Sequence, residues 1–500
     1  MSTAVEPDDP VPTLGQPKAL FPWLESKPGL VCAPLLLLLL NFALRSQLEE
    51  AGSHLYSHAE AAWPQATLES VRAMPWWRFL LPIPEFSGTW TTTSNMLVWN
   101  LETWLAPAAI YYLGNALFVG VTYGLAYHST RSGLFAFTLG LCAAFTTHNY
   151  QVYAVTGTIA LYLVMVYAEV VFFCLYRLWG AEEGRVTRWA ILSALALVPF
   201  VLSYEGWLDF ASYCWLAAPV LYGYHRRRGE AQRARRVLIT WIGISALAVI
   251  YVAVKVNCGF GQVKGSESDL VFNSPWPRLA VEDALTHVVT FFYTSISTFI
   301  PGPLAGSEAL GQVGAEALVA DQHGYHSQAN HLIPMNYHFS WRFLAGGALA
   351  LWLGMILRTT RKLWTRPEPR TLAVLLVLIL VLVGSPTHAL VKMRPMHTVP
   401  FLGYQVWLSV LGLFALVGLV VRRLEQAGIS RGWARILVAL IWLDVVSCAF
   451  TRPPVLSEMA KSMGVGWSYP DPWERLCELS DLPWRRWVTT VVVWVKSLLG

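Results

Sequence analysis

Charged side chains are scarce in this chain of 500 residues: Asp, Glu, Lys and Arg together make up 13%. Soluble globular proteins carry about 25%. Hydrophobic residues reach 55% and the mean hydropathy is +0.45. These values argue against a soluble enzyme and indicate a membrane protein built from many apolar helices.

Metal and disulfide motifs are also missing. None of the seven cysteines forms a Cys-x-x-Cys pair, and most lie in or beside apolar runs, where a free thiol behaves as a small hydrophobe. His323 and His326 have a spacing that zinc can use, but no nearby acid completes a site. We therefore expect no cofactor; a divalent metal stays open as an alternative, although no motif supports it.

A cleavable signal peptide is not indicated. Residues 1–28 are polar and rich in proline, without the basic segment that begins a secretory signal. The apolar run that follows ends at Arg45 and not at a small-residue cleavage site. We expect a cytoplasmic tail over 1–28 and a retained first span.

Basic residues are confined to alternate gaps between apolar runs. Nineteen of the 36 Lys and Arg fall in five short gaps, namely Arg131, Arg177 to Arg188, Arg226 to Arg236, Arg358 to Arg370 and Arg422 to Arg435. Cytoplasmic loops retain Lys and Arg during insertion, so the alternation predicts which gaps face inside. Because lipid-length apolar runs separate these gaps, they do not form a nucleic-acid surface.

A bilayer crossing takes about 20 apolar residues, and the apolar runs predict an all-α, polytopic bundle of about eleven spans. The predicted spans are 29–44, 104–127, 133–147, 152–176, 189–204, 207–224, 237–256, 343–357, 371–388, 401–421 and 435–451. With the N-terminus inside, these spans place the C-terminus outside.

Two long external segments divide the chain. The first membrane half, 29–256, contains an external loop at 45–100, where paired tryptophans suit a helix on the membrane surface. A large external loop, 257–342, precedes the second half, 343–451, and an external tail at 452–500. The run 284–300 within the large loop is interrupted by polar residues, which favours a re-entrant or surface-lying helix.

Three carboxylates in the first external loop are candidates for a catalytic base. Glu49 and Glu50 follow the first span closely, and Arg45 lies four residues before Glu49, so the two can pair on one helix face. Glu85 lies between prolines and apolar residues, which can raise a carboxyl pKa. A base of this kind could accept the proton of an incoming hydroxyl.

Three cationic or titratable side chains break the inside-positive pattern. Lys392, Arg394 and His397 lie in an external gap, so something besides topology must retain them there. Phosphate binding is a natural reason, since Arg offers a bidentate fork and Lys a compact charge.

Two short external turns carry further polar groups. Glu205 and Asp209 lie where two spans meet almost without a connection, and carboxylates at membrane depth usually mark functional sites. His148 lies in a second turn made of hydrogen-bonding residues, which suits a polar ligand.

The layout resembles the GT-C superfamily of membrane glycosyltransferases. The resemblance rests on the first span with its acidic external loop (Glu49, Glu50), the later external cations (Lys392, Arg394) and the many spans over residues 29–451. It implies transfer of a sugar from a polyprenyl-phosphate donor to an acceptor glycan, lipid or protein at the outer face. The chain has Glu-Glu where the family commonly has Asp-Asp or Asp-Glu.

Two other functions compete with this interpretation. A transporter or lipid flippase would use Glu205 and Asp209, and a non-catalytic assembly component would need none of these groups. All three predict residence among membrane lipids, with a bacterial inner (plasma) membrane as the expected location.

Overall fold

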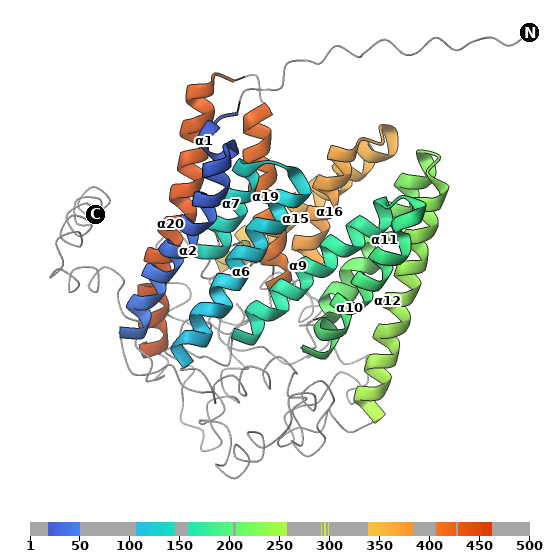
Figure 1. Ribbon diagram of the computed structural model, residues 1–500, viewed down its shortest axis with the longest axis horizontal. Coiled ribbons are helices and arrows are strands. Elements are labelled where there is room, and N and C mark those ends of the chain that lie inside the picture. The colour runs from blue at the N-terminus through green and yellow to red at the C-terminus, as the bar shows by residue number, and fades with distance from the viewer. Residues whose placement is uncertain are drawn as a thin grey trace, which may run out of the picture.

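The computed structural model describes residues 19–50, 107–145, 159–203, 207–257, 292, 295–296, 299, 339–383, 407–426 and 429–462. Within these ranges the chain is helical, without strands (Figure 1). The short helix α1 (Pro22–Glu25) and a 3-10 turn, η3 (Glu183–Arg185), accompany the longer helices. The longer helices are α2 (Lys27–Glu50), α6 (Pro107–Thr130), α7 (Gly133–Phe145), α9 (Ile159–Gly180), α10 (Val186–Ser203), α11 (Trp207–Arg227), α12 (Ala231–Asn257), α15 (Phe339–Thr365), α16 (Pro369–Val383), α19 (Trp407–Gln426) and α20 (Arg431–Ser462).

Each predicted span overlaps one of these longer helices, and the described residues are helical, which confirms the all-α class. Several helices continue past the apolar run: α15 extends from 357 to Thr365, and α20 from 451 to Ser462. Polar residues do not end a helix by themselves, since the backbone hydrogen bonds continue through them. Links at one end are short, with Arg131 (φ 54°) and Gly229 (φ 73°) in left-handed conformations just after α6 and α11.

The helices carry the apolar outer surface of a membrane protein. Leu351 and Leu357 on α15 are 73% and 71% exposed, and Leu39 on α2 is 66% exposed. A soluble monomer rarely exposes apolar surface on this scale.

By length and composition, four helices among the described residues could cross a bilayer. They lie at Tyr162–Gly180, Glu183–Val201, Ala231–Tyr251 and Trp407–Gln426. Shorter apolar helices cover Lys27–Asn41, Gly133–Phe145 and Pro369–Val383. The total of about eleven spans stays a prediction.

The five basic gaps lie at one end of the bundle, uppermost in Figure 1. Hydrogen bonds join three of them: Arg236 on α12 donates to the carbonyl of Ala181 after α9, and Arg227 at the end of α11 donates to the carbonyl of Trp364 on α15. Each contact links one gap to another that is far away in the sequence.

The other two basic gaps, at Arg131 and at Arg422 to Arg435, lie at the same end, beside α1 and the end of α6. Glu25 of α1 accepts a hydrogen bond from the backbone N–H of Leu134, 3.1 Å away, and Arg435 donates to the carbonyl of Leu20 at 2.7 Å. His128 at the end of α6 accepts from Arg177 of α9 at 3.5 Å. The alternation seen in the sequence therefore corresponds to one physical face, which we call the basic end.

The run 284–300 contributes four described residues to the bundle, at helical spacing. Phe292 packs edge-on against Trp352 of α15 with ring centroids 5.5 Å apart, and Phe299 lies 5.9 Å from Phe414 of α19. Ser295 and Phe292 are buried. These described residues therefore pack against α15 and α19.

Close helix packing depends on small residues at a few crossings. A Cβ on Gly412 of α19 would lie 2.8 Å from Val381 Cγ2 and 3.0 Å from Val381 N on α16. The same crossing carries a hydrogen bond of 2.8 Å from Ser409 to the carbonyl of Val381. Gly243 on α12, in contrast, has open space around its Cα.

Gly412→Ala should therefore destabilise the protein. The new methyl group would clash with the backbone of α16, which cannot move aside as a flexible side chain can. We expect a cost of about 1–3 kcal/mol, typical of overpacking, seen as a lower thermal midpoint in detergent. The matched variant Gly243→Ala should leave the midpoint unchanged or slightly higher. Equal midpoints for the two variants would contradict the close α16–α19 contact.

Single cysteines at Ala231 and Pro367 should react with a membrane-impermeant maleimide only from the cytoplasmic side, because both lie at the basic end. Cysteines at Ser457 and Gln328 should react from outside. The test uses a cysteine-free background in intact and permeabilised cells. Labelling of Gln328 from the cytoplasm would reverse the orientation of the largest loop.

Candidate functional site

The described helix ends nearest in sequence to the predicted site residues lie opposite the basic end. The chain alternates between the two ends, so the last residues of α2, α7, α10 and α16 share this opposite face, which we call the site end. Most of the predicted residues lie outside the described residues, namely Glu85, His148, Glu205, Lys392, Arg394 and His397. The helix ends that flank them are described.

Glu49 and Glu50 form the end of α2. The helix includes Arg45, so Arg45 and Glu49 lie one turn apart on a continuous helix, as predicted; the structure describes the backbone here. Two turns earlier, Asn41 is 3% exposed and donates its amide to the carbonyl of Ala144, 3.0 Å away. Ala144 lies at the end of α7, so this bond fixes α2 beside the helix that leads to His148.

The end of α10 lies beside the start of α19. The ring of Phe200 on α10 meets that of Trp407, the first residue of α19, edge-on at 6.0 Å. Phe200 also packs against Phe210 of α11 at 5.5 Å. The links 204–206, with Glu205, and 384–406, with Lys392 and Arg394, therefore end at neighbouring helix termini.

Asp209 is the predicted site residue whose side chain the structure describes. It lies in the first turn of α11 and is 1% exposed. A carboxylate in that turn interacts favourably with the positive end of the helix dipole. Asp209 thus lies in the wall of the bundle, next to the aromatic cluster around Phe200 and Phe210.

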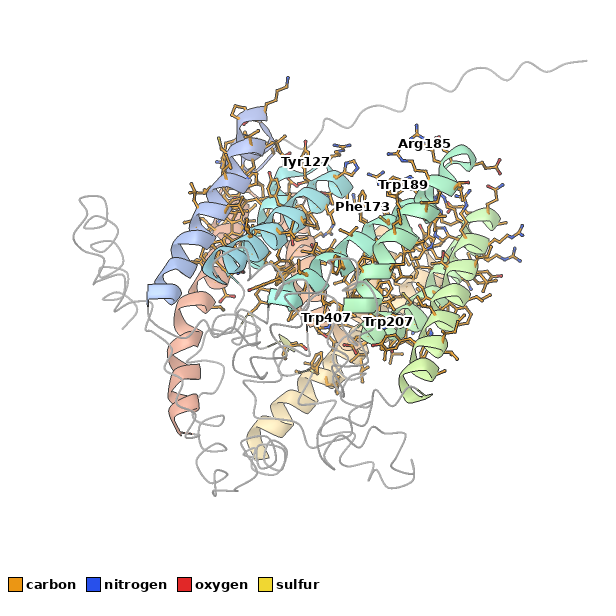
Figure 2. The ribbon with its side chains drawn as sticks, turned by 60° about the horizontal axis from the view of Figure 1, so that its bottom comes forward. Tyr127, Phe173, Arg185, Trp189, Trp207 and Trp407 are labelled. Atoms are coloured by element: carbon orange, nitrogen blue, oxygen red, sulfur yellow. The ribbon has the colours of Figure 1, made fainter. Side chains whose placement is uncertain are left out.

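Two tryptophans at this end add donors that sequence reasoning did not identify. Trp207 and Trp407 begin α11 and α19, are 0% and 1% exposed, and each has an indole N–H without a hydrogen-bond partner in the described part of the chain. Figure 2 shows both toward the end away from Arg185 and Trp189. A buried unpaired donor costs about 1–3 kcal/mol, so each indole N–H is a candidate to bind an acceptor.

Another carboxylate, that of Glu169, lies deeper in the bundle. Glu169 on α9 accepts hydrogen bonds from the hydroxyl of Thr122 on α6 at 2.8 and 3.0 Å. This contact joins two helices and accounts for a carboxylate within a hydrophobic helix.

The described ranges hold no cluster of three His, Cys, Asp or Glu side chains that could bind a metal. The five cysteines described are free thiols, namely Cys32, Cys142, Cys174, Cys214 and Cys448.

Comparisons with known proteins leave the family open. No protein-family model matches the chain, and no curated protein does. Among solved structures, the apo oligosaccharyltransferase of Archaeoglobus fulgidus aligns with a TM-score of 0.42 and 12% identity, over 91% of this chain. The chain spans 58% of the length of that protein. A likeness at this level leaves the function to be argued from the chain's own residues.

Proposed function

We propose that this chain is a membrane glycosyltransferase that moves a sugar from a polyprenyl-phosphate donor to an acceptor at the outer face of the membrane. The observation that supports it most is the meeting of helix ends at the site end. The end of α10 adjoins the start of α19, with the rings of Phe200 and Trp407 6.0 Å apart. The α2 helix, which ends in Glu49 and Glu50, is bonded to the end of α7.

In this proposal the lipid phosphate binds in the link before α19. Lys392 and Arg394 would neutralise the phosphate, with His397 as a further donor, because a leaving phosphate gains negative charge as its bond to the sugar breaks. The indole N–H groups of Trp207 and Trp407 offer two more donors at the termini of the neighbouring helices.

The acceptor would be activated by a carboxylate of the first loop, Glu49, Glu50 or Glu85. Its hydroxyl oxygen forms the new bond to the anomeric carbon while the bond from that carbon to the phosphate oxygen breaks. The hydroxyl proton passes to the carboxylate, and the lipid phosphate leaves with the bonding electron pair. Glu205, Asp209 and His148 would shape the pocket for the polar sugar and acceptor.

The proposed setting follows from the orientation of the basic end. With that end in the cytoplasm, the site end faces outward, the N-terminus lies inside and the C-terminus outside. A bacterial inner membrane would supply the carrier lipid. The acceptor can be a glycan, a lipid or a protein, each of which presents a nucleophilic group on that side. The proposal requires no metal ion or other cofactor.

A transporter or lipid flippase is the second candidate, and the burial of Asp209 favours it. A carboxylate that is 1% exposed at the end of a membrane helix could carry a proton or hold a substrate. In that case the first-loop carboxylates would contribute little.

Glu49→Gln should lower the turnover of a lipid-linked sugar by about 10²–10⁴-fold while donor binding stays nearly intact, because the base is needed only for bond formation. If Glu49→Gln leaves turnover unchanged, the same measurement is made on Glu50→Gln and Glu85→Gln. The measurement is glycosyl transfer by the purified protein, with donor binding assayed in parallel. A transporter would instead lose most function on changing Glu205 or Asp209 and form no covalent product. Equal tolerance at all five carboxylates would favour an assembly component.

Arg394→Ala should weaken binding of a polyprenyl-phosphate donor roughly tenfold or more, since a charge-assisted hydrogen bond contributes about 1.5–3 kcal/mol. Arg394→Lys should retain only part of the affinity, because the bidentate fork is lost while the charge remains. Binding is measured by titration of the detergent-solubilised protein. Wild-type affinity in a double variant that also carries Lys392→Ala would rule out the phosphate role.

A further inference from the structure

A cavity of about 620 Å³ opens at the basic end, far from the proposed catalytic end. It lies between the end of α9 with its following link, the end of α11 with the start of α12, and the start of α16. Figure 2 shows Arg185 and Trp189, two of its lining residues, at this end of the molecule. Neither the topology nor the proposed transfer reaction uses this space.

The cavity is positively charged. Arginines outnumber carboxylates in its lining by four to two: Arg177, Arg185, Arg228 and Arg233 against Glu182 and Glu230. An excess of guanidinium groups in a concave site attracts anions, and Arg binds phosphate oxygens through paired N–H groups.

Glu230 holds two of these arginines in place. Its carboxylate lies 3.0 Å from Arg228 Nε, 3.1 Å from Arg233 Nη1 and 2.7 Å from His225 Nδ1. Burial raises the pKa of Glu230, but hydrogen bonds from His225 and Arg233 outweigh it, so the pKa lies below its usual value. Glu230 therefore stays ionised at neutral pH and keeps this part of the wall rigid.

Arg177 brings a donor that the protein does not satisfy. Its guanidinium lies over the ring of Phe173, 5.2 Å from the centroid, and one terminal nitrogen donates to the carbonyl of His128 at 3.5 Å. Its Nε is buried and has no hydrogen-bond partner among the described residues. A buried charged donor of this kind is costly unless an acceptor binds.

The inner wall of the cavity is apolar. Leu221 of α11 and Leu372 and Leu376 of α16 line it, with Trp179 and Trp189 also in the lining. Arginine together with tryptophan at helix ends is typical of the level where lipid head groups meet the hydrocarbon. The site thus combines an anion-binding rim with a wall that suits the first carbons of an acyl chain.

We propose that this cavity binds the phosphate of an anionic membrane phospholipid, with its acyl chain against Leu221, Leu372 and Leu376. Free phosphate shares the head-group chemistry but would leave the apolar wall unfilled. Bound lipid would join the α9–α10 link to α11 and α16, which lie far apart in the sequence. Basic pockets between helices on the cytoplasmic side suit anionic head groups. The lipid is thus a stabilising ligand of the cytoplasmic half.

The test measures lipid retention by native mass spectrometry and the thermal midpoint of the full-length protein, using phosphatidylcholine bilayers with or without phosphatidylglycerol. Phosphatidylglycerol should remain bound and raise the midpoint. Arg185 is exposed and forms no ion pair with the other described residues. Arg185→Gln should weaken phosphatidylglycerol binding roughly tenfold, as expected for loss of one charge-assisted hydrogen bond. Arg177→Lys should also weaken it while preserving the charge.

The matched control is Arg235→Gln, which removes the same charge from an exposed position of α12 outside the cavity. It should bind phosphatidylglycerol as the wild type does. If Arg235→Gln lost as much phosphatidylglycerol binding as Arg185→Gln, the lipid would be held by diffuse attraction to positive charge. That result would overturn the proposal. If inorganic phosphate alone raised the thermal midpoint as much as phosphatidylglycerol does, the lipid assignment would be overturned. Equal retention of phosphatidylcholine and phosphatidylglycerol would also overturn it.

Discussion

The cost of moving a guanidinium through hydrocarbon is the constraint on which the rest of this structure depends. At the centre of a membrane helix that cost is at least about 2.5–3.5 kcal/mol for each Arg or Lys. The basic gaps therefore stay together at one end, and contacts such as Arg227 with Trp364 and Arg435 with Leu20 join them there. The opposite end is formed by helix termini, among them the starts of α11 and α19 at Trp207 and Trp407.

The two ends differ in how they are held together. At the basic end many polar groups pair with one another, with Glu230 paired to Arg228 and Arg233 and with Arg236 bonded across to Ala181, while Arg177 Nε keeps an unpaired donor. At the site end aromatic rings pack at helix termini, and the indoles of Trp207 and Trp407 keep unpaired donors. Unpaired donors suit a region that binds a ligand, and the described residues have them at both ends. They are the physical basis for the two ligands that we propose, an anionic head group at the basic end and a donor phosphate at the site end.

The sequence predicted the helices well because an apolar run in a bilayer has few alternatives to a helix. It also predicted that the basic gaps share a face. The extension of α20 to Ser462 escaped prediction, since hydropathy marks the bilayer and not the end of a helix. The burial of Trp407 was hidden because this side chain packs against Phe200, which is distant in sequence. Trp207 likewise packs against Tyr251 of the next helix, α12. Trp207 directly follows the short polar stretch Ser203 to Gly206, a signal that could have been noticed, whereas Trp407 lies inside the predicted span 401–421 and has no such signal.

The most direct test of the central claim is photo-crosslinking with a polyprenyl-phosphate that carries a reactive group beside its phosphate. After irradiation in reconstituted membranes, mass spectrometry maps the modified peptides. The account predicts modification of the link before α19, around Arg394, and of the segments at the end of α2 and the start of α11. Modification concentrated at the basic end, or spread evenly over the lipid-facing helices, would contradict it.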